Sequence, residues 1–286
     1  MMLGGIEAGG TKFVLAVGTS PDSVLARHVI PTHDPATTLA EAAAWFAGRG
    51  IGALGIGCFG PVELDPRSER WGFITTTPKP GWADCDVAGY MAAALGVPVG
   101  FDTDVNAAAL AEHRAAGGGA GSLAYLTIGT GIGGGLVLEG RPVHGIAHPE
   151  VGHIYPRRHP QDVDFAGVCP HHGDCLEGLA AGPAILARWG ASLSDLPEDH
   201  PGHAIIADYV AQACHLLFAT TAVGEVVIGG GVAQTPGLAR RVAARARELD
   251  AGYLPGGARH AVIRPRLGGD SGIVGALLLA QGTAGA

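Results

Sequence analysis

The chain has 286 residues, 47% of them hydrophobic, and a formal net charge of -8. This composition is typical of a globular protein with enough chain for one large or two medium domains, and it excludes a disordered one. The negative charge and scattered basic residues also exclude a nucleic-acid-binding protein, because only residues 240–247 gather arginines, which we interpret as a solvated helix face.

No apolar run reaches transmembrane length, and the N-terminus lacks the charged and apolar segments of a signal peptide. The five cysteines are odd in number, which is typical of a reducing compartment rather than of a disulfide framework. We therefore expect a cytoplasmic protein without a membrane partner.

The first half is expected to begin with a β-hairpin, since residues 3–18 form two short apolar segments joined by a glycine turn. Helices and strands then alternate. The patterns predict helices over 36–49, 86–95 and 104–116, and strands over 51–58 and 97–102.

Residues 123–143 repeat the hairpin plan half a chain later, which indicates two related halves. The later patterns predict a strand over 226–228 and helices over 182–189, 203–223, 237–249 and 271–281. This alternation indicates an α/β fold with sheets covered on both faces. Since no low-complexity linker is present, the halves are expected to share a cleft.

Four metal-capable side chains lie within a short stretch: His153, Cys169, His172 and Cys175. Zn²⁺ prefers four nitrogen or sulfur ligands, and Cys-x2-His-x2-Cys supplies three of them at turn-compatible spacing. Because protein ligands would fill all four positions, the pattern predicts a structural zinc site. The alternative is a histidine-rich loop with two ordinary cysteines.

Two carboxylates, Glu150 and Glu177, border this stretch, so the zinc site would bring them near each other. Two acceptors next to an imidazole are suited to the hydroxyl groups of a polyhydroxylated ligand. The alternative is a pair of solvated loop acids.

Three glycine turns follow predicted strands: Gly9-Gly10-Thr11, Gly129-Thr130-Gly131 and Gly229-Gly230-Gly231. Backbone N–H groups freed in such turns form anion sites, so the three together predict a phosphate-rich nucleotide ligand. The first turn continues with Lys12 in the order Gly-Thr-Lys, which is not that of a Walker A loop. The second contains a Gly-x-Gly-x-x-Gly pattern, but a strand rather than a helix is expected after it, which argues against a Rossmann site.

A candidate base follows the strand predicted over 97–102. Asp104 would lie at the carboxyl edge of the sheet, where a carboxylate could accept the proton of an attacking hydroxyl. The alternative is that Thr103 or Asp104 only caps the following helix. Asp102 is a second carboxylate within reach.

Several motifs together resemble those of the ROK family of sugar kinases, most closely its bacterial fructokinase branch. In chain order they are IEAGGTKF, GCFGPV, FDTDVNAAALAE, TIGTGIGGGLV, HPEVGH, CPHHGDCLEGLAAGPA and VIGGGV. The resemblance covers nearly the whole chain, and the HPEVGH and CPHHGDCLEG motifs are its specific part.

The resemblance implies two actin-like, ribonuclease-H-like ATPase domains with a cleft between them. Residues 1–115 with 271–286 would form the smaller domain, and residues 116–270 the larger one with the zinc loop. The implied activity is transfer of phosphate from ATP, with Mg²⁺, to the 6-hydroxyl of D-fructose. A homodimer is also implied.

The resemblance also implies roles for individual residues. Asp104 matches the catalytic base, and Thr103, expected to bind the sugar, stands where many relatives have asparagine. The remaining matched positions are the sugar-binding Glu150, His153 and Glu177, the phosphate turns Gly9 to Lys12 and Gly129 to Gly131, the nucleotide-side Pro183 and Gly229 to Gly231, and the zinc ligands His153, Cys169, His172 and Cys175. His172 replaces a cysteine of many relatives, and Glu7 replaces an aspartate, which leaves a Mg²⁺ role for Glu7 open.

Three alternatives remain. One is a kinase for glucose, mannose or an N-acetylated sugar, and another is a non-catalytic sugar sensor. The third is a zinc hydrolase or deaminase, since His148-Pro149-Glu150 imitates a His-x-Glu element. That enzyme class needs a later Pro-Cys-x2-Cys, which this sequence lacks.

Overall fold

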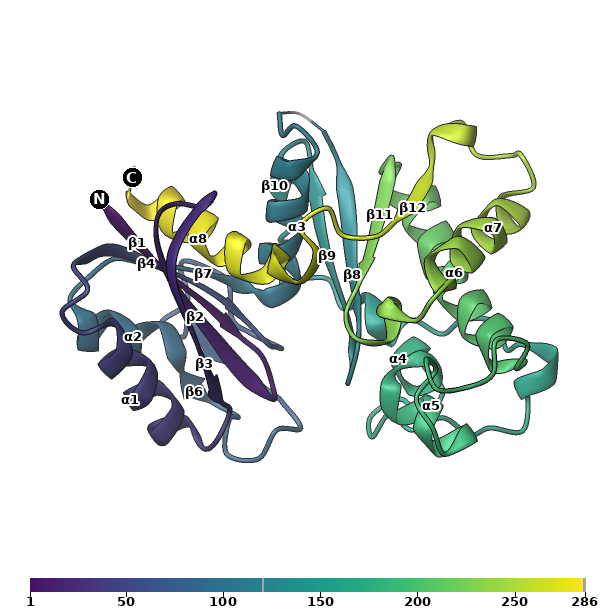
Figure 1. Ribbon diagram of the computed structural model, residues 1–286, viewed down its shortest axis with the longest axis horizontal. Helices are drawn as coiled ribbons and strands as arrows, with labels where there is room; N and C mark the ends of the chain where they lie inside the picture. The colour runs from purple at the N-terminus through teal and green to yellow at the C-terminus, as the bar shows by residue number, and fades with distance from the viewer. Residues whose placement is uncertain (120, 285–286) are drawn as a thin grey trace. The chain divides into compact units, whose positions relative to one another are not determined.

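The chain folds into two units, which the computed structural model describes over residues 1–119 and 121–284 (Figure 1). Unit 1 contains Met1–Gly117, Arg141–Pro149 and Asp270–Ala286. Unit 2 contains Gly118–Gly140 and Glu150–Gly269. The chain therefore returns to unit 1 twice, once through a short segment and once through its last helix.

Unit 1 is built on a five-stranded sheet with the order β3-β2-β1-β4-β7. The strands are β1 (Met2–Ala8), β2 (Lys12–Ser20), β3 (Ser23–Pro31), β4 (Ile51–Cys58) and β7 (Val99–Thr103). β1 and β2 form the predicted hairpin, whereas β1, β4 and β7 run parallel. In register, Ala8 is opposite Cys58 and Cys58 is opposite Thr103, so the three parallel strands end side by side.

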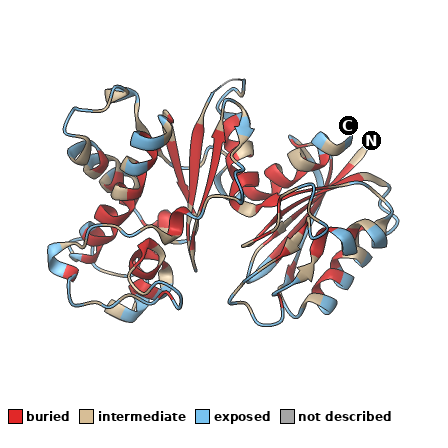
Figure 2. Ribbon diagram, turned by 180° about the vertical axis from the view of Figure 1, so that it is seen from behind, coloured by how far each residue is buried: buried red, intermediate tan, exposed pale blue. Residues whose placement is uncertain are grey.

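Helices cover both faces of this sheet, as the sequence predicted. Successive strand residues point to opposite faces, so Gly4 of β1 contacts Phe46 while Gly5 contacts Leu277. The helices are α1 (Pro35–Phe46) and α2 (Val87–Leu95) on the first face, and α8 (Ser271–Ala284) on the second, where it packs against α3 (Asp104–Ala115). Buried residues concentrate in the strands between them (Figure 2).

Close packing ties α8 to α3. A Cβ on Gly275 would lie 2.0 Å from the Ala107 carbonyl oxygen, so only glycine permits this approach. The buried Ser271 hydroxyl also donates to Glu112 Oε1 at 2.7 Å. The C-terminal helix is therefore an integral part of unit 1.

The second sheet has the order β10-β9-β8-β11-β12, which repeats the plan of the first. Its strands are β8 (Leu123–Ile128), β9 (Ile132–Leu138), β10 (Arg141–Pro142), β11 (Glu225–Gly229) and β12 (Ala261–Ile263). β8 and β9 form a hairpin, and β8, β11 and β12 run parallel. The prediction of two related halves is confirmed, and a strand rather than a helix does follow the second glycine turn.

The helices of unit 2 are α4 (Leu176–Ala180), α5 (Gly182–Trp189), α6 (Gly202–Thr221) and α7 (Leu238–Asp250). By length and composition α6 could cross a membrane, contrary to the expectation from the sequence. Most of it is buried, however, and it packs against α4 and α7. We therefore interpret α6 as a core helix of unit 2.

Some elements were missed by the sequence patterns. β3 is mostly exposed, with Ile30 its one buried residue, so it has no apolar alternation to detect. The other missed elements are short. They include α4, β10 and β12, whose bounds are given above, and β5 (Phe73–Ile74), β6 (Cys85–Asp86), η1 (Val151–His153), η2 (Pro160–Asp162), η3 (Val232–Gln234), η4 (Gly257–Arg259) and η5 (Gly268–Asp270).

A buried ion pair anchors the segment between η1 and α4. Arg188 of α5 binds both carboxylate oxygens of Asp162 at 2.8 Å, and the Tyr209 hydroxyl donates to Asp162 Oδ2 at 2.7 Å. The arginine and aspartate side chains are only 4% and 5% exposed, so the bidentate geometry and the third donor are needed to offset their desolvation.

Candidate functional site

The first glycine turn lies at the carboxyl end of β1. Its Gly9 N–H donates to the Lys12 carbonyl at 3.0 Å, and Thr32 Oγ1 donates to the Gly9 carbonyl at 2.7 Å. These bonds hold the turn in one shape, with Gly10 and Thr11 exposed at its tip. Exposed backbone at the end of a parallel strand is suited to binding an anion.

Asp104 is the first residue of α3 and lies at the same edge of the sheet, because β1, β4 and β7 end in register. It is half-buried, and its Oδ1 accepts the Val105 N–H at 2.9 Å. Burial and then the charge of Asp104 raise the pKa of the Cys58 thiol well above its usual range, which locates that charge beside the end of β4.

Thr103 caps α3, as one of the two sequence interpretations proposed. Its Oγ1 accepts the Asn106 N–H at 3.0 Å, and the residue is 3% exposed. A hydroxyl that accepts one bond retains a proton to donate. Capping therefore leaves the predicted sugar-binding role chemically open.

Asp102 is buried and fully engaged. Its Oδ1 accepts from Thr103 N–H at 2.7 Å and Asn106 Nδ2 at 2.8 Å, while its Oδ2 accepts from His144 Nε2 at 2.9 Å. His144 is a residue that the sequence analysis missed, since it follows β10 and is remote from Asp102 in sequence. The hydrogen bond to Asp102 raises the pKa of His144.

Glu7 lies at the end of β1 in a nearly closed environment. Burial raises the pKa of its carboxyl group, and Lys12 and Arg27 partly oppose that effect. A Cβ on Gly272 of α8 would lie 2.5 Å from Glu7 Oε1, so the backbone of α8 packs closely against the carboxylate.

In unit 2, the other two glycine turns lie next to each other. β8 and β11 are parallel neighbours, with Gly229 opposite Thr127. A Cβ on Gly129 would lie 3.9 Å from Gly231 N, and the Gly129 carbonyl accepts the Gly182 N–H at 2.8 Å. Pro183 is in the first turn of α5. The structure thus brings together the predicted nucleotide-side residues of unit 2.

Glu177 lies in the first turn of α4 and contacts the β8–β9 turn. Its Oε2 accepts the Ile132 N–H at 3.0 Å. A Cβ on Gly131 would come within 2.6 Å of the same oxygen. Glycine at 131 is therefore required for the carboxylate to reach the backbone.

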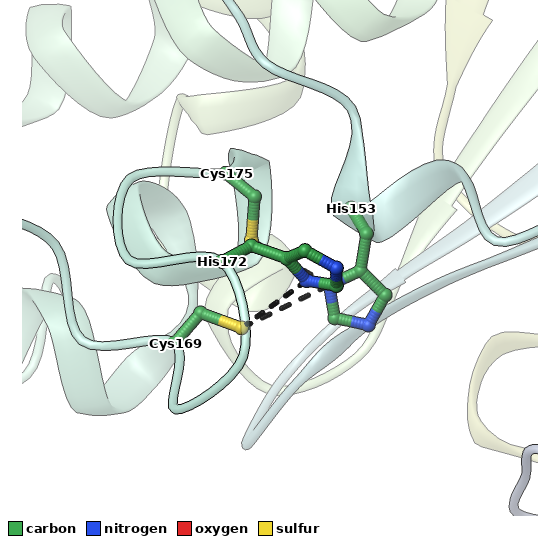
Figure 3. A group of neighbouring side chains, drawn as sticks. All are labelled: His153, Cys169, His172 and Cys175. Atoms are coloured by element: carbon green, nitrogen blue, oxygen red, sulfur yellow. Dashed lines mark hydrogen bonds between the residues drawn. The ribbon is translucent and has the colours of Figure 1, made fainter.

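The four predicted metal ligands form one cluster (Figure 3). Their ligand atoms all lie within 4.8 Å of one another. Cys169 Sγ lies 3.9 Å from His153 Nδ1 and 3.8 Å from His172 Nδ1, and His153 Nδ1 lies 3.5 Å from Cys175 Sγ. A tetrahedral zinc ion with sulfur and nitrogen ligands separates them by about 3.4–3.8 Å. The residues therefore fit a tetrahedral metal ion.

The protonation of the cysteines and the neighbours of the histidines also matter for metal binding. Burial raises the pKa of the Cys175 thiol to about 11, and a bound metal would favour the thiolate instead. The second nitrogen of His153, Nε2, lies 4.0 Å from Glu150 Oε2. Metal-binding imidazoles commonly have a carboxylate on this side.

The Cys175 side chain also caps α4, since its Sγ accepts the Gly178 N–H at 3.5 Å. Glu177 is two residues further on. The metal cluster therefore controls where α4 begins, and through it the position of Glu177 against the β8–β9 turn.

Comparison with known proteins places these features in a family. The model of the ROK family matches residues 3–283. The chain belongs to the ROK family. It is 42% identical to the fructokinase of Zymomonas mobilis, over 97% of this chain and 95% of that protein.

Solved structures of ROK family proteins are also similar to this chain. The ROK hexokinase of Thermus thermophilus has a TM-score of 0.78 and 31% identity, covering 100% of this chain and 99% of that one. A ROK family glucokinase of Streptomyces griseus, solved with glucose and AMPPNP, has a TM-score of 0.75 and 25% identity, covering 99% and 100%. The predicted family and actin-like ATPase fold are confirmed, and the deaminase alternative is rejected.

For this ROK-family protein we predict that Cys169→Ser lowers metal content and thermal stability, because a structural metal contributes its binding free energy to folding. Elemental analysis and the melting temperature measure the two effects. Cys85→Ser, a half-buried cysteine outside the cluster, is the control. Unchanged metal content and melting temperature in Cys169→Ser would contradict the assignment.

A second prediction concerns His144, whose pKa is raised above the ordinary 6.5 by Asp102. Its charged form therefore stabilises the fold fully below pH 6.5, and this contribution is lost as the pH rises through the raised value. The difference in unfolding free energy between the native protein and His144→Gln should shrink accordingly. Urea denaturation followed by tryptophan fluorescence would detect it, since Trp45, Trp71 and Trp82 lie in unit 1. A pH-independent difference would refute this account.

Proposed function

We propose that this ROK-family protein is a fructokinase, which transfers phosphate from ATP to the 6-hydroxyl of D-fructose. The observation that carries the proposal is its 42% identity to a fructokinase over nearly the full length of both chains. The identity to a ROK glucokinase is lower, at 25%. The motifs of the sequence support the same activity.

In the proposed reaction, Asp104 accepts the proton of the 6-hydroxyl while the oxygen of that hydroxyl forms a bond to the γ-phosphorus of ATP. The bond from that phosphorus to the β-bridging oxygen breaks, and ADP leaves. The position of Asp104 supports this role, because it follows a parallel strand at the edge that also carries Gly9 to Lys12. Asp102 is less suited, since both of its oxygens already accept hydrogen bonds.

The sugar hydroxyls are assigned to Glu150, His153, Glu177 and Thr103. The carboxylates accept hydrogen bonds from hydroxyls, and His153 offers the nitrogen that faces away from the metal cluster. Thr103 retains a donor proton despite its capping bond.

The phosphates of ATP are assigned to the turns Gly9 to Lys12 and Gly129 to Gly131, with Pro183 and Gly229 to Gly231 on the nucleotide side. Support comes from the adjacent turns of unit 2. Mg²⁺ would neutralise charge that develops on the transferred phosphoryl group, and it is usually held largely through substrate phosphates.

We further propose that the metal in the cluster is structural zinc, because the four protein ligands complete a tetrahedral shell. Residues 1–115 with 271–286 and residues 116–270 are proposed as the two actin-like domains. The protein is proposed to be cytoplasmic and to act as a homodimer.

A kinase for another hexose is the second candidate, because the structural neighbours include a hexokinase and a glucokinase. An assay of ADP release with Mg-ATP and fructose, glucose, mannose or N-acetylmannosamine separates the two. We expect the highest kcat/KM with fructose. Equal values across sugars would remove the fructose assignment, and no turnover with any of them would favour a sugar sensor.

The Asp104→Asn variant should lose about 10²- to 10⁴-fold in kcat, the usual contribution of a general base. Because asparagine is similar in shape, the KM for the sugar should change much less. Asp164→Asn, at an exposed acidic position in unit 2, is the control. Near-normal turnover of a folded Asp104→Asn protein would reject Asp104 as the base.

A further inference from the structure

An arginine-lined hollow in unit 2 has no place in the proposed reaction. Its volume is about 740 Å³, which is within the range of pockets that hold small molecules. It lies between the segment after η1, helix α6 and helix α7. We call it the arginine hollow. The residues that line it include Arg157, Arg158, Ala204, Ala207, Asp208, Arg241, Ala244, Arg245 and Glu248.

The arginine hollow carries excess positive charge, although the chain as a whole carries -8. Arg245 is neutralised, because it pairs with Asp208 at 2.6 Å and Glu248 at 2.9 Å. Arg158 pairs with Asp174 at 3.1 Å. Within the described residues, Arg157 and Arg241 have no ion-pair partner. The four arginines therefore face three carboxylates, which leaves one excess positive charge at the hollow.

The guanidinium groups also have unused donor capacity. The Nε–H groups of Arg158 and Arg241 are shielded from solvent and lack an acceptor among the described residues. The NH2 group of Arg241 has one long contact, 3.3 Å to the Glu198 carbonyl. A shielded Nε–H group is out of reach of a ligand as well as of water. The donors that the hollow offers to acceptor oxygens are therefore the terminal N–H groups of Arg157 and Arg241.

The backbone holds Arg157 in place at the rim. Gln212 of α6 accepts the Arg157 N–H at 2.8 Å and donates to the Arg157 carbonyl at 3.0 Å. Gln212 itself is fixed by Asp208 at 2.8 Å. A preorganised backbone lowers the entropic cost of binding a ligand at this side chain.

Alanines supply an apolar part of the lining, at positions 204, 207 and 244. Their small side chains leave room between α6 and α7 that larger residues would fill. A ligand with both a strongly anionic group and a small carbon skeleton matches this combination of arginine and alanine.

We propose that the arginine hollow binds a phosphorylated small molecule, with the phosphate held by Arg157 and Arg241. Guanidinium groups bind phosphate oxygens with charge-assisted and often bidentate hydrogen bonds. None of the residues assigned to sugar, ATP or zinc lines this hollow, so the proposal concerns a second site and does not depend on the kinase activity.

The test is calorimetric titration of the full-length protein with inorganic phosphate and with glycerol 3-phosphate. Native protein, the double variant Arg157→Gln/Arg241→Gln and the control Arg240→Gln would be compared. Arg240 is exposed on the same helix but does not line the hollow. We expect the double variant to raise the Kd about tenfold or more, as loss of hydrogen bonds to charged groups does, and the control to leave it unchanged.

Added salt should weaken binding in the native protein, because the contacts are between charges near the surface. Circular dichroism would confirm that the double variant is folded. Equal Kd values in all three proteins, or no binding to the native protein, would overturn the proposal. A change of oligomeric state in the double variant with unchanged phosphate affinity would also overturn it, in favour of a second copy of the chain as the occupant.

Discussion

The pairing of parallel strands in register is the constraint on which the rest of the structure depends. Once β1, β4 and β7 pair, Ala8, Cys58 and Thr103 must lie in one row, and whatever follows each strand shares one edge. The same pairing of β8 with β11 brings two glycine turns together in unit 2. Chemistry-bearing residues are thus gathered by the sheets, not by contacts among themselves.

The segment between η1 and α4 lies outside both sheets and is held by two other features. Its outer part is anchored by the buried pair of Asp162 and Arg188, and its inner part by the metal cluster. Cys175 belongs to both the cluster and α4, because its sulfur caps that helix. Burial raises the pKa of this thiol, the backbone N–H groups of Gly178 and Glu177 partly oppose that effect, and a bound cation would favour the thiolate. Binding of the proposed metal would therefore be linked to the position of Glu177.

Much of this arrangement could be predicted from the sequence, because the glycine turns, the metal ligands and Asp104 have local signatures. β3 could not, since an exposed edge strand has no buried alternation to reveal it. His144 could not either: its partner Asp102 is 42 residues away, and only the fold brings the two to 2.9 Å. The arginine hollow is a similar case. The arginines of α7 were interpreted as a solvated face. Only tertiary packing brings two of them, Arg241 and Arg245, to the same hollow as Arg157.

Asp102 and Asp104 show how neighbouring carboxylates acquire different functions. Asp102 lies in the buried strand β7, one residue before its end, and accepts hydrogen bonds from Thr103, Asn106 and His144. Asp104, two residues later, begins a helix and is half-buried at the edge of the sheet. The N-terminus of a helix favours a negative charge, so this position is suited to a carboxylate. The buried carboxylate therefore helps to fix the start of α3, whereas the edge carboxylate lies in the position from which we propose that it accepts a proton from the substrate.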